Sequence, residues 1–222
     1  MVVGVATGRG KSVRKELRER IDASLWGRMP IAYYNGAEAG LLDNDRLPGQ
    51  DKTLSTPLDS LFELISREPS ISQRCAIETN RHQLSVVPHH LDAVPEVWAL
   101  VRSLIEFHGF KDVRALRSDH SVDILMIGVS KAAVFRAVRE LARGRQDLAI
   151  LCIGDRGCWP GNDCDLLCWP HSLSVDETSM EPAHCWNLAS PGASHTAALV
   201  EYLGLLEYES GRAFFPARCF EG

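Results

Sequence analysis

The sequence predicts an α/β fold in which a parallel-sheet core is interrupted by an inserted α+β module. Residues 148–153 form a short unbroken apolar run, as expected of a strand buried on both faces of a parallel sheet. Residues 1–21 have the pattern strand, glycine-containing turn, amphipathic helix. Residues 37–124 differ, with turn-rich polar stretches between short strands and helices. We therefore expect core residues 1–36 and 125–222, with the module at 37–124.

Composition limits the classes of function. The 222 residues carry a net charge of -5, which argues against a nucleic-acid surface, and 45% are hydrophobic, enough to bury a core. No apolar run approaches the roughly 20 residues that a membrane span needs, and the first residues lack a signal-peptide pattern. Seven cysteines, an odd number, favour a reducing compartment. The expectation is a cytoplasmic protein without nucleic-acid or membrane partners.

The first unit offers a phosphate site. A strand over 1–6 leads into the turn 7–10, and a helix over 11–21 follows with Val13, Leu17 and Ile21 on one face. Two interpretations compete. The segment 5–12 nearly fits the phosphate loop G-x-x-x-x-G-K-[ST], but Val5 stands at the first glycine, so an NTPase is the minor alternative. In the other, the Thr7 hydroxyl donates to a phosphate oxygen, and a second buried strand ends in the Asn35-Gly36 turn signal.

The inserted module is predicted to hold two helices and three strands. One helix starts at Ser55 or Thr56 and ends before Pro69, and the other covers 95–107. Strands are expected at 83–87, 113–116 and 122–127.

The core resumes with a helix that Ser130 caps and Gly144 ends. A lysine in a first helical turn opposes the helix dipole, which is easier to understand if Lys131 reaches towards an anion, although a solvated lysine fits as well. Further on we expect strands at 171–175 and 213–215 and a helix over 193–207.

Polar side chains gather where the strand 148–153 ends. Asp155, Asn162 and Asp163 follow it within a turn-rich loop, and the carboxyl ends of parallel strands line the ligand crevice of α/β sheets. Three oxygen-bearing side chains suit Mg²⁺, which proteins hold by few carboxylates together with substrate phosphate. A zinc site at Cys158, Cys164, Cys168 and His171 is disfavoured, since their spacing has no C-x-x-C pair.

Together, Ala6-Thr7-Gly8-Arg9-Gly10, Tyr34-Asn35-Gly36-Ala37, Gly128-Val129-Ser130-Lys131 and Gly154-Asp155 with Asn162-Asp163 resemble the haloacid dehalogenase (HAD) superfamily, especially its sugar-phosphate phosphatases with a large α/β cap. The resemblance implies a Rossmann-like core with an inserted cap and hydrolysis of a small phosphorylated metabolite. It implies that Thr7, with Gly8 and Asn35, binds the phosphate and that Lys131 neutralises it. Asp155 would ligate Mg²⁺, with Asn162 and Asp163 completing the metal and lysine surroundings.

The sequence departs from this family at two points. Six residues, where the family has two, separate Asp155 from Asn162, and the motif D-x-D-x-T, with its nucleophile and its central strand, is absent. We expect a truncated, late-started or split phosphatase with little activity alone, whose missing motif an upstream segment or partner supplies. The alternative is a non-catalytic phosphate-binding or regulatory module of a larger protein.

Overall fold

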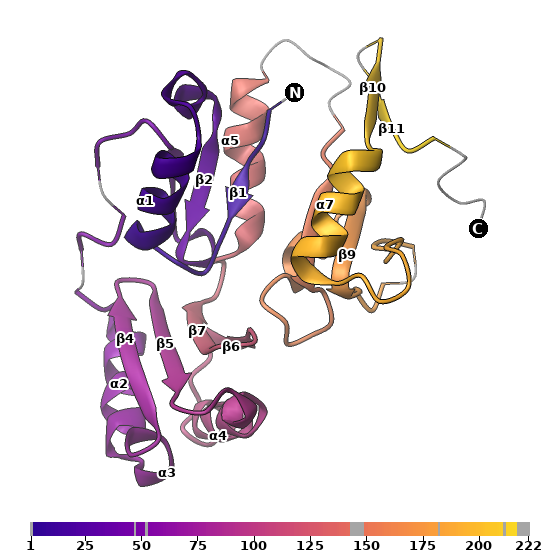
Figure 1. Cartoon of the computed structure of the whole chain (residues 1–222). Helices are drawn as coiled ribbons and strands as arrows, with labels where there is room; N and C mark the ends of the chain where they lie inside the picture. Colours follow the sequence, from indigo (N-terminus) through magenta and orange to yellow (C-terminus); the bar gives the residue numbers. More distant parts are fainter. Residues whose placement is uncertain are drawn as a thin grey trace.

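The protein was analysed as a computed structural model that describes residues 2–46, 48–51, 53–142, 149–181, 183–210 and 212–216. The described strands form four sheets, β1-β2-β3, β4-β5-β7-β6, β8-β9 and β10-β11, within the arrangement of elements shown in Figure 1. The predicted helix end at Gly144 and the start of the predicted strand 148–153 lie outside the described residues. No helix in the described ranges is both long enough and apolar enough to cross a membrane.

The first sheet has the order β1-β2-β3, with β1 (Val5–Ala6) parallel to β2 (Pro30–Tyr33) and β3 (Glu38–Leu41) antiparallel to it. Side chains of β2 alternate between its two faces: Ile31 packs on the side of α1 (Lys11–Arg20), and Ala32 on the side of α5 (Val134–Leu141). Both faces of β2 are therefore covered. The 3-10 helices η1 (Ala23–Arg28) and η2 (Tyr34–Gly36) flank this strand.

The second sheet has the order β4-β5-β7-β6, with antiparallel neighbours throughout. We call it, with its helices, the four-stranded module. Its elements are β4 (Cys75–Asn80), β5 (Gln83–Pro88), β6 (Val113–Arg117), β7 (Val122–Met126), α2 (Thr56–Arg67), α3 (Pro69–Ser72), η3 (Leu91–Ala93) and α4 (Val94–Phe107).

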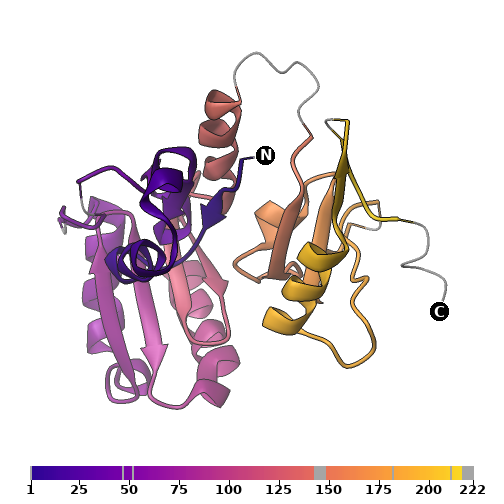
Figure 2. The ribbon, with the colours of Figure 1, turned by 45° about the horizontal axis from the view of Figure 1, so that its top comes forward.

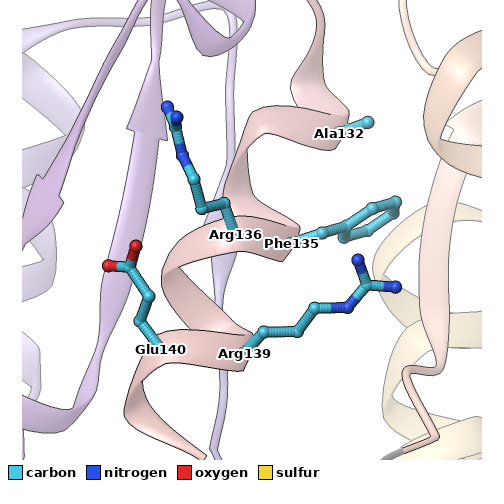
Figure 3. A pocket seen from close by; sticks show the side chains of 5 residues that line it. All are labelled: Ala132, Phe135, Arg136, Arg139 and Glu140. Atoms are coloured by element: carbon cyan, nitrogen blue, oxygen red, sulfur yellow. The ribbon is translucent and has the colours of Figure 1, made fainter.

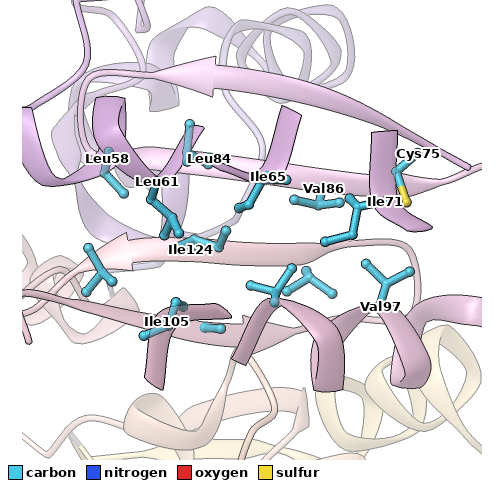
Figure 4. Close-up of a cluster of buried hydrophobic side chains, with 14 of the residues drawn as sticks. Leu58, Leu61, Ile65, Ile71, Cys75, Leu84, Val86, Val97, Ile105 and Ile124 are labelled. Carbon is cyan, nitrogen blue, oxygen red and sulfur yellow. The ribbon is translucent and has the colours of Figure 1, made fainter. Parts of the chain in front are cut away.

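Alternation along β5 and β7 gives the four-stranded module one apolar face. Leu84 and Ile124 are fully buried with Leu58, Leu61 and residues of α4 (Figure 4). The residues next to them along each strand, including Ser85 on β5 and Asp123 on β7, point to the opposite face of the sheet. This second face meets Asn35 of the first sheet's turn through Asp123, while its apolar residues Leu116 and Leu125 pack against Cys164.

The third group joins β8 (Cys152–Arg156) and β9 (Ser172–Glu177) in parallel. With it lie α6 (Cys164–Leu167), α7 (His195–Leu205) and the hairpin of β10 (Glu207–Glu209) and β11 (Arg212–Phe214). Figures 1 and 2 show no described strand between β1 and the β8–β9 pair. One apolar cluster nevertheless spans both groups, because α5 packs against Ala6 and Ala32 on one side and Cys152 on the other.

Within the described part of the chain, the strand predicted over 1–6 is observed only at Val5–Ala6, and the helix predicted over 193–207 only at His195–Leu205. Three further differences are larger. The strand predicted at 148–153 runs over Cys152–Arg156, so Asp155 lies inside β8 and not after it. No sequence pattern indicated β4, which is an edge strand with mixed polar and apolar residues. Residues 38–41, placed by the prediction in the inserted module, pair with β2 as β3 because the turn that contains Asn35 and Gly36 reverses the chain. The division into core 1–36 and 125–222 and module 37–124 otherwise stays a prediction.

Candidate functional site

Lys131 and Asp163 form a buried ion pair. Lys131 starts η4 (Lys131–Ala133), whose first turn Ser130 caps by accepting a hydrogen bond from the Ala132 amide at 3.2 Å. The Lys131 Nζ donates to Asp163 Oδ1 at 2.6 Å, and both side chains are only 8% exposed. Lys131 thus reaches an anion, the carboxylate of a residue 32 positions away.

The second oxygen of Asp163 fixes β8. Asp163 Oδ2 accepts a hydrogen bond from the Asp155 backbone amide at 3.0 Å. Burial raises the pKa of Asp163, but the charge of Lys131 and the hydrogen bonds outweigh it, so this pKa lies below its usual value. Burial and the neighbouring Asp163 carboxylate raise the pKa of Asp155 to about 6. Both oxygens of Asp163 accept hydrogen bonds, whereas the surroundings of Asp155 disfavour its ionised form.

A cation would suit these surroundings. A positive charge beside Asp155 offsets the burial and the Asp163 charge that raise its pKa. Asn162 Oδ1 is buried and accepts no hydrogen bond from the described residues. Carboxylate and amide oxygens are the ligands that hard divalent cations prefer in proteins.

Two residues that the sequence analysis did not single out lie beside Asp155. Asp119, from the turn between β6 and β7, and His195, at the start of α7, each place a potential ligand atom so that the three atoms lie within 4.8 Å of one another. Asp119 also pairs with Arg156. No sequence pattern marks Asp119 or His195, since only the fold brings their segments to β8.

The Thr7–Gly8 turn is held to the end of β2 by the backbone. The Thr7 amide donates to the Ala32 carbonyl at 2.9 Å, and the Asn35 amide donates to the Thr7 carbonyl at 2.8 Å. The Thr7 hydroxyl oxygen accepts the Arg9 amide at 3.0 Å, which leaves its hydrogen available for an anion. Thr7, Gly8 and Asn35 are thus brought together.

Gly36 connects this group to Lys131. Asn35 has left-handed backbone angles (φ 55°), and Gly36 follows with φ 95°. A β-carbon on Gly36 would overlap the Ser130 carbonyl oxygen, so only glycine permits this approach of the η2 and η4 backbones. As a result, Asn35 and Lys131 come from adjoining turns although they lie far apart in the sequence.

Asp123 is a further residue that the sequence analysis missed. It lies on β7, is 3% exposed, and accepts a hydrogen bond from Asn35 Nδ2 at 2.8 Å. The signal for it was a charged residue within an otherwise apolar strand, which is unusual unless the charge has partners.

The cavities lie elsewhere. One of about 520 Å³ runs along α5, and Figure 3 shows Phe135 and Arg139 on one side of the helix with Arg136 and Glu140 on the other. Phe135 packs against Trp169 with ring centroids 4.5 Å apart, so this cavity borders a packing contact. Because no predicted phosphate or metal residue lines it, we place the candidate site by the contacts of Lys131, Asp155 and Asn35 instead.

Comparison with known proteins identifies the fold. No sequence-family profile and no curated protein sequence matches the chain. The sucrose-phosphatase of Synechocystis sp. PCC6803, solved with sucrose and phosphate, matches with a TM-score of 0.55 at 17% identity, over 91% of this chain and 83% of that one. A sugar phosphatase of HAD subclass IIB matches with a TM-score of 0.51 at 13% identity, over 81% and 75%. The chain has the haloacid dehalogenase fold.

The HAD fold accounts for the layout described above. The predicted fold class, an α/β Rossmann-like core with an inserted α+β cap, is confirmed. A third match is the N-terminally truncated IMP-nucleotidase of Plasmodium falciparum, with a TM-score of 0.51 at 12% identity over 81% of this chain. The chain spans only 58% of the length of that nucleotidase. These similarities concern the fold, since one fold supports many functions, and the roles of the site residues rest on their own geometry.

Proposed function

We propose that this chain forms the phosphate and metal site of a HAD-type, Mg²⁺-dependent phosphohydrolase for a small phosphorylated metabolite, with a sugar phosphate as the leading substrate class. The observation that carries the proposal is the buried link from Lys131 through Asp163 to the backbone of Asp155. Burying the two charged side chains of Lys131 and Asp163 is costly, and a site that binds charged ligands explains why they are kept.

The residues divide the work between two ends of the site. The Thr7 hydroxyl donates to the transferring phosphoryl group, Gly8 lets the chain approach it closely, and Asn35 holds the turn. Lys131 offsets phosphate charge. When bound, Mg²⁺ would neutralise charge on the phosphoryl oxygens, and Asp155 would hold it.

Asn162 and Asp163 have different roles in the proposed metal site. Asn162 Oδ1 accepts no hydrogen bond from the described residues and can ligate the ion, whereas Asp163, whose oxygens bind Lys131 and the Asp155 amide, orients both. The four-stranded module would act as the cap that covers the phosphate.

We further propose that a strand bearing carboxylates, from an upstream segment or a partner, completes the site between β1 and β8. Among the described strands β1 pairs only with β2, and β8 only with β9, so one edge of each offers unpaired backbone groups. Apolar Val3 and Leu151, next to these edges, are 48% and 39% exposed. An added strand would cover both and bring the nucleophile that the sequence lacks.

Phosphate binding tests the site directly. We expect inorganic phosphate to bind the full chain more tightly with Mg²⁺ than without it, measured by titration calorimetry. Lys131→Ala should weaken this binding at least tenfold, and Asp155→Asn should remove its Mg²⁺ dependence. Lys11→Ala is the matched control, since it removes an exposed lysine from the first turn of α1. Binding of ATP that Lys11→Ala abolishes and Lys131→Ala leaves unchanged would instead support the NTPase.

Hydrolysis tests the added strand. The chain alone should release little phosphate from sugar phosphates, and a version extended by an apolar strand with D-x-D-x-T should release more, in a Mg²⁺-dependent way. Steady Mg²⁺-dependent release that survives Asp155→Asn contradicts the metal role.

A non-catalytic phosphate-binding module is the second candidate, because the sequence keeps Lys131 and Asp155 while it contains no D-x-D-x-T. Binding without turnover, in both the original and the extended chain, would favour it.

A further inference from the structure

The Asn35 side chain is hydrogen-bonded to two polar residues of the four-stranded module, Gln83 and Asp123. Gln83 Nε2 donates to Ser85 Oγ at 2.6 Å, and Ser85 Oγ donates to Asp123 Oδ1 at 2.8 Å. Asn35 Nδ2 closes the ring, donating to Asp123 Oδ2 at 2.8 Å and to Gln83 Oε1 at 3.3 Å. Ser85 and Asp123 are direct cross-strand neighbours, so the sheet register itself places the ring.

Two buried acceptors in this ring have spare capacity. Asp123 Oδ1 is filled by Ser85 and by Ser121 at 3.1 Å, but Oδ2 accepts only from Asn35 among the described residues and keeps a free lone pair. Asn35 Oδ1 is buried and accepts no hydrogen bond from that same part of the chain. A buried acceptor without a donor is costly, so a ligand that donates a hydrogen bond here is favoured.

Both acceptors lie close to Gly8, in the turn that is proposed to bind phosphate. A β-carbon built on Gly8 would lie 3.2 Å from Asp123 Oδ2 and 3.5 Å from Asn35 Oδ1. An anion bound at the Gly8 backbone would therefore have a carboxylate and a carbonyl-type oxygen as neighbours. An unprotonated oxygen of that anion would be repelled, whereas a hydroxyl would be a hydrogen-bond donor to them.

Burial has the largest effect on the acidity of Asp123. It holds the pKa of Asp123 above its usual value, although hydrogen bonds from Asn35, Ser85 and Ser121 and the charge of Lys131 lower this pKa. Lys131 is the one charged group among the described residues that is found to act on Asp123, and its other partners are neutral. Selection for a P–OH requires that the ligand, and not Asp123, carries the shared proton, because a protonated carboxyl group would donate to any anion.

Building on the proposed function, we propose that Asp123 determines the specificity of the phosphate site. Its Oδ2 atom, with Asn35 Oδ1, accepts the hydrogen of a protonated phosphoryl oxygen. The site thereby selects a phosphoryl group that carries a P–OH and rejects a tetrahedral anion that has no proton to give.

Inorganic phosphate and sulfate are the probes, because they share size and shape while sulfate carries no proton near neutral pH. Their dissociation constants are measured by calorimetry on the full chain with Mg²⁺ at pH 6. We expect phosphate to bind at least tenfold more tightly than sulfate. In Asp123→Asn the ratio should fall to about one, since an amide can donate to either anion. Asp112→Asn, the same change at an exposed position of the four-stranded module, should keep the original ratio.

A measurement on the original chain tests the proposal even if the Asp123→Asn variant does not fold. The phosphate-to-sulfate preference should decline as pH rises from 6 to 8 and the P–OH is lost, and groups that act on both anions cancel in this ratio. Equal binding of the two anions at pH 6, a preference that does not change with pH, or a ratio retained in a folded Asp123→Asn would overturn the proposal while leaving phosphate binding intact. If neither anion binds the original chain, the proposed phosphate site fails as well.

Discussion

Removal of Lys131 is expected to destabilise the protein strongly. Lys131→Met keeps the length of the side chain and deletes its charge, leaving the Asp163 carboxylate, 8% exposed, without its cation. Breaking a buried ion pair by removing one partner costs about 3–5 kcal/mol, because the remaining charge is neither solvated nor paired. An exposed pair costs about 0–1 kcal/mol. Because both partners are buried, we expect the larger cost, that of a buried pair.

The double variant Lys131→Met with Asp163→Asn separates the two explanations. It removes both charges, and the side-chain carbonyl oxygen of the introduced asparagine can still accept the Asp155 amide. We therefore expect much of the loss to be regained, to within about 1–2 kcal/mol of the original protein. Free energies of unfolding from urea titrations at pH 7 give these differences. Lys11→Ala serves as the exposed-lysine control and should change stability by less than about 0.5 kcal/mol.

The pH dependence gives a second check on the same pair. In the original chain the pKa of Asp163 is below the unfolded value of 3.8, so its contribution to stability is present above that value and is lost as pH falls through the folded pKa. In Lys131→Met the unpaired carboxylate takes up a proton more easily, so the deficit should shrink between pH 7 and pH 4. A single variant that costs less than about 1 kcal/mol, or a double variant as unstable as the single one, would refute a buried pair.

Two further perturbations probe the site. The pKa of Asp155 rises from 3.8 to about 6 on folding, so the folded state binds more protons in that window and loses stability as pH increases across it. Asp155→Asn should then stabilise the metal-free protein by about 1–2 kcal/mol at pH 8, after allowance for partial exposure, and by little at pH 4, as urea midpoints at both pH values would show; equal effects at both contradict the shift. Gly36→Ala should cost more than about 2 kcal/mol, because its β-carbon overlaps the Ser130 carbonyl, whereas Gly109→Ala, at φ 70° with nothing within 4 Å, should cost about 1 kcal/mol; similar losses would exclude the overlap.

Sequence patterns predicted those parts of the fold that depend on local periodicity. The helix at 11–21 is observed at Lys11–Arg20, and the helix at 95–107 at Val94–Phe107, since each has a clear apolar stripe and a proline or turn at its limits. The edge strand β4 was missed because its alternation is weak. The start of β8 was placed too early, since an apolar run alone cannot show which of its residues have a partner strand.

The site was less accessible to prediction because its groups interact through space. Lys131 could be nominated from its place in a first helical turn and Asp163 from its loop after an apolar strand, but their direct contact depends on how η4 meets the start of α6. Asp119 and His195 approach Asp155 only because a hairpin of the four-stranded module and the start of α7 meet at β8. To predict the role of Asp123, one would have to know which face of β7 the helices cover.

The balance of charges links the phosphate and metal ends of the proposed site. Within the described residues, Lys131 is the cation that acts on Asp123, on Asp155 and on Asp163. One positive charge faces three carboxyl groups, so a phosphate dianion that entered alone would add to an excess of negative charge. A divalent cation beside Asp155 reverses that balance, and a proton shared at Asp123 lowers the charge that must be neutralised. If the proposed site is correct, binding of phosphate, metal and proton should therefore be coupled through Lys131, although Asp123, Lys131 and Asp155 belong to three different elements of the fold.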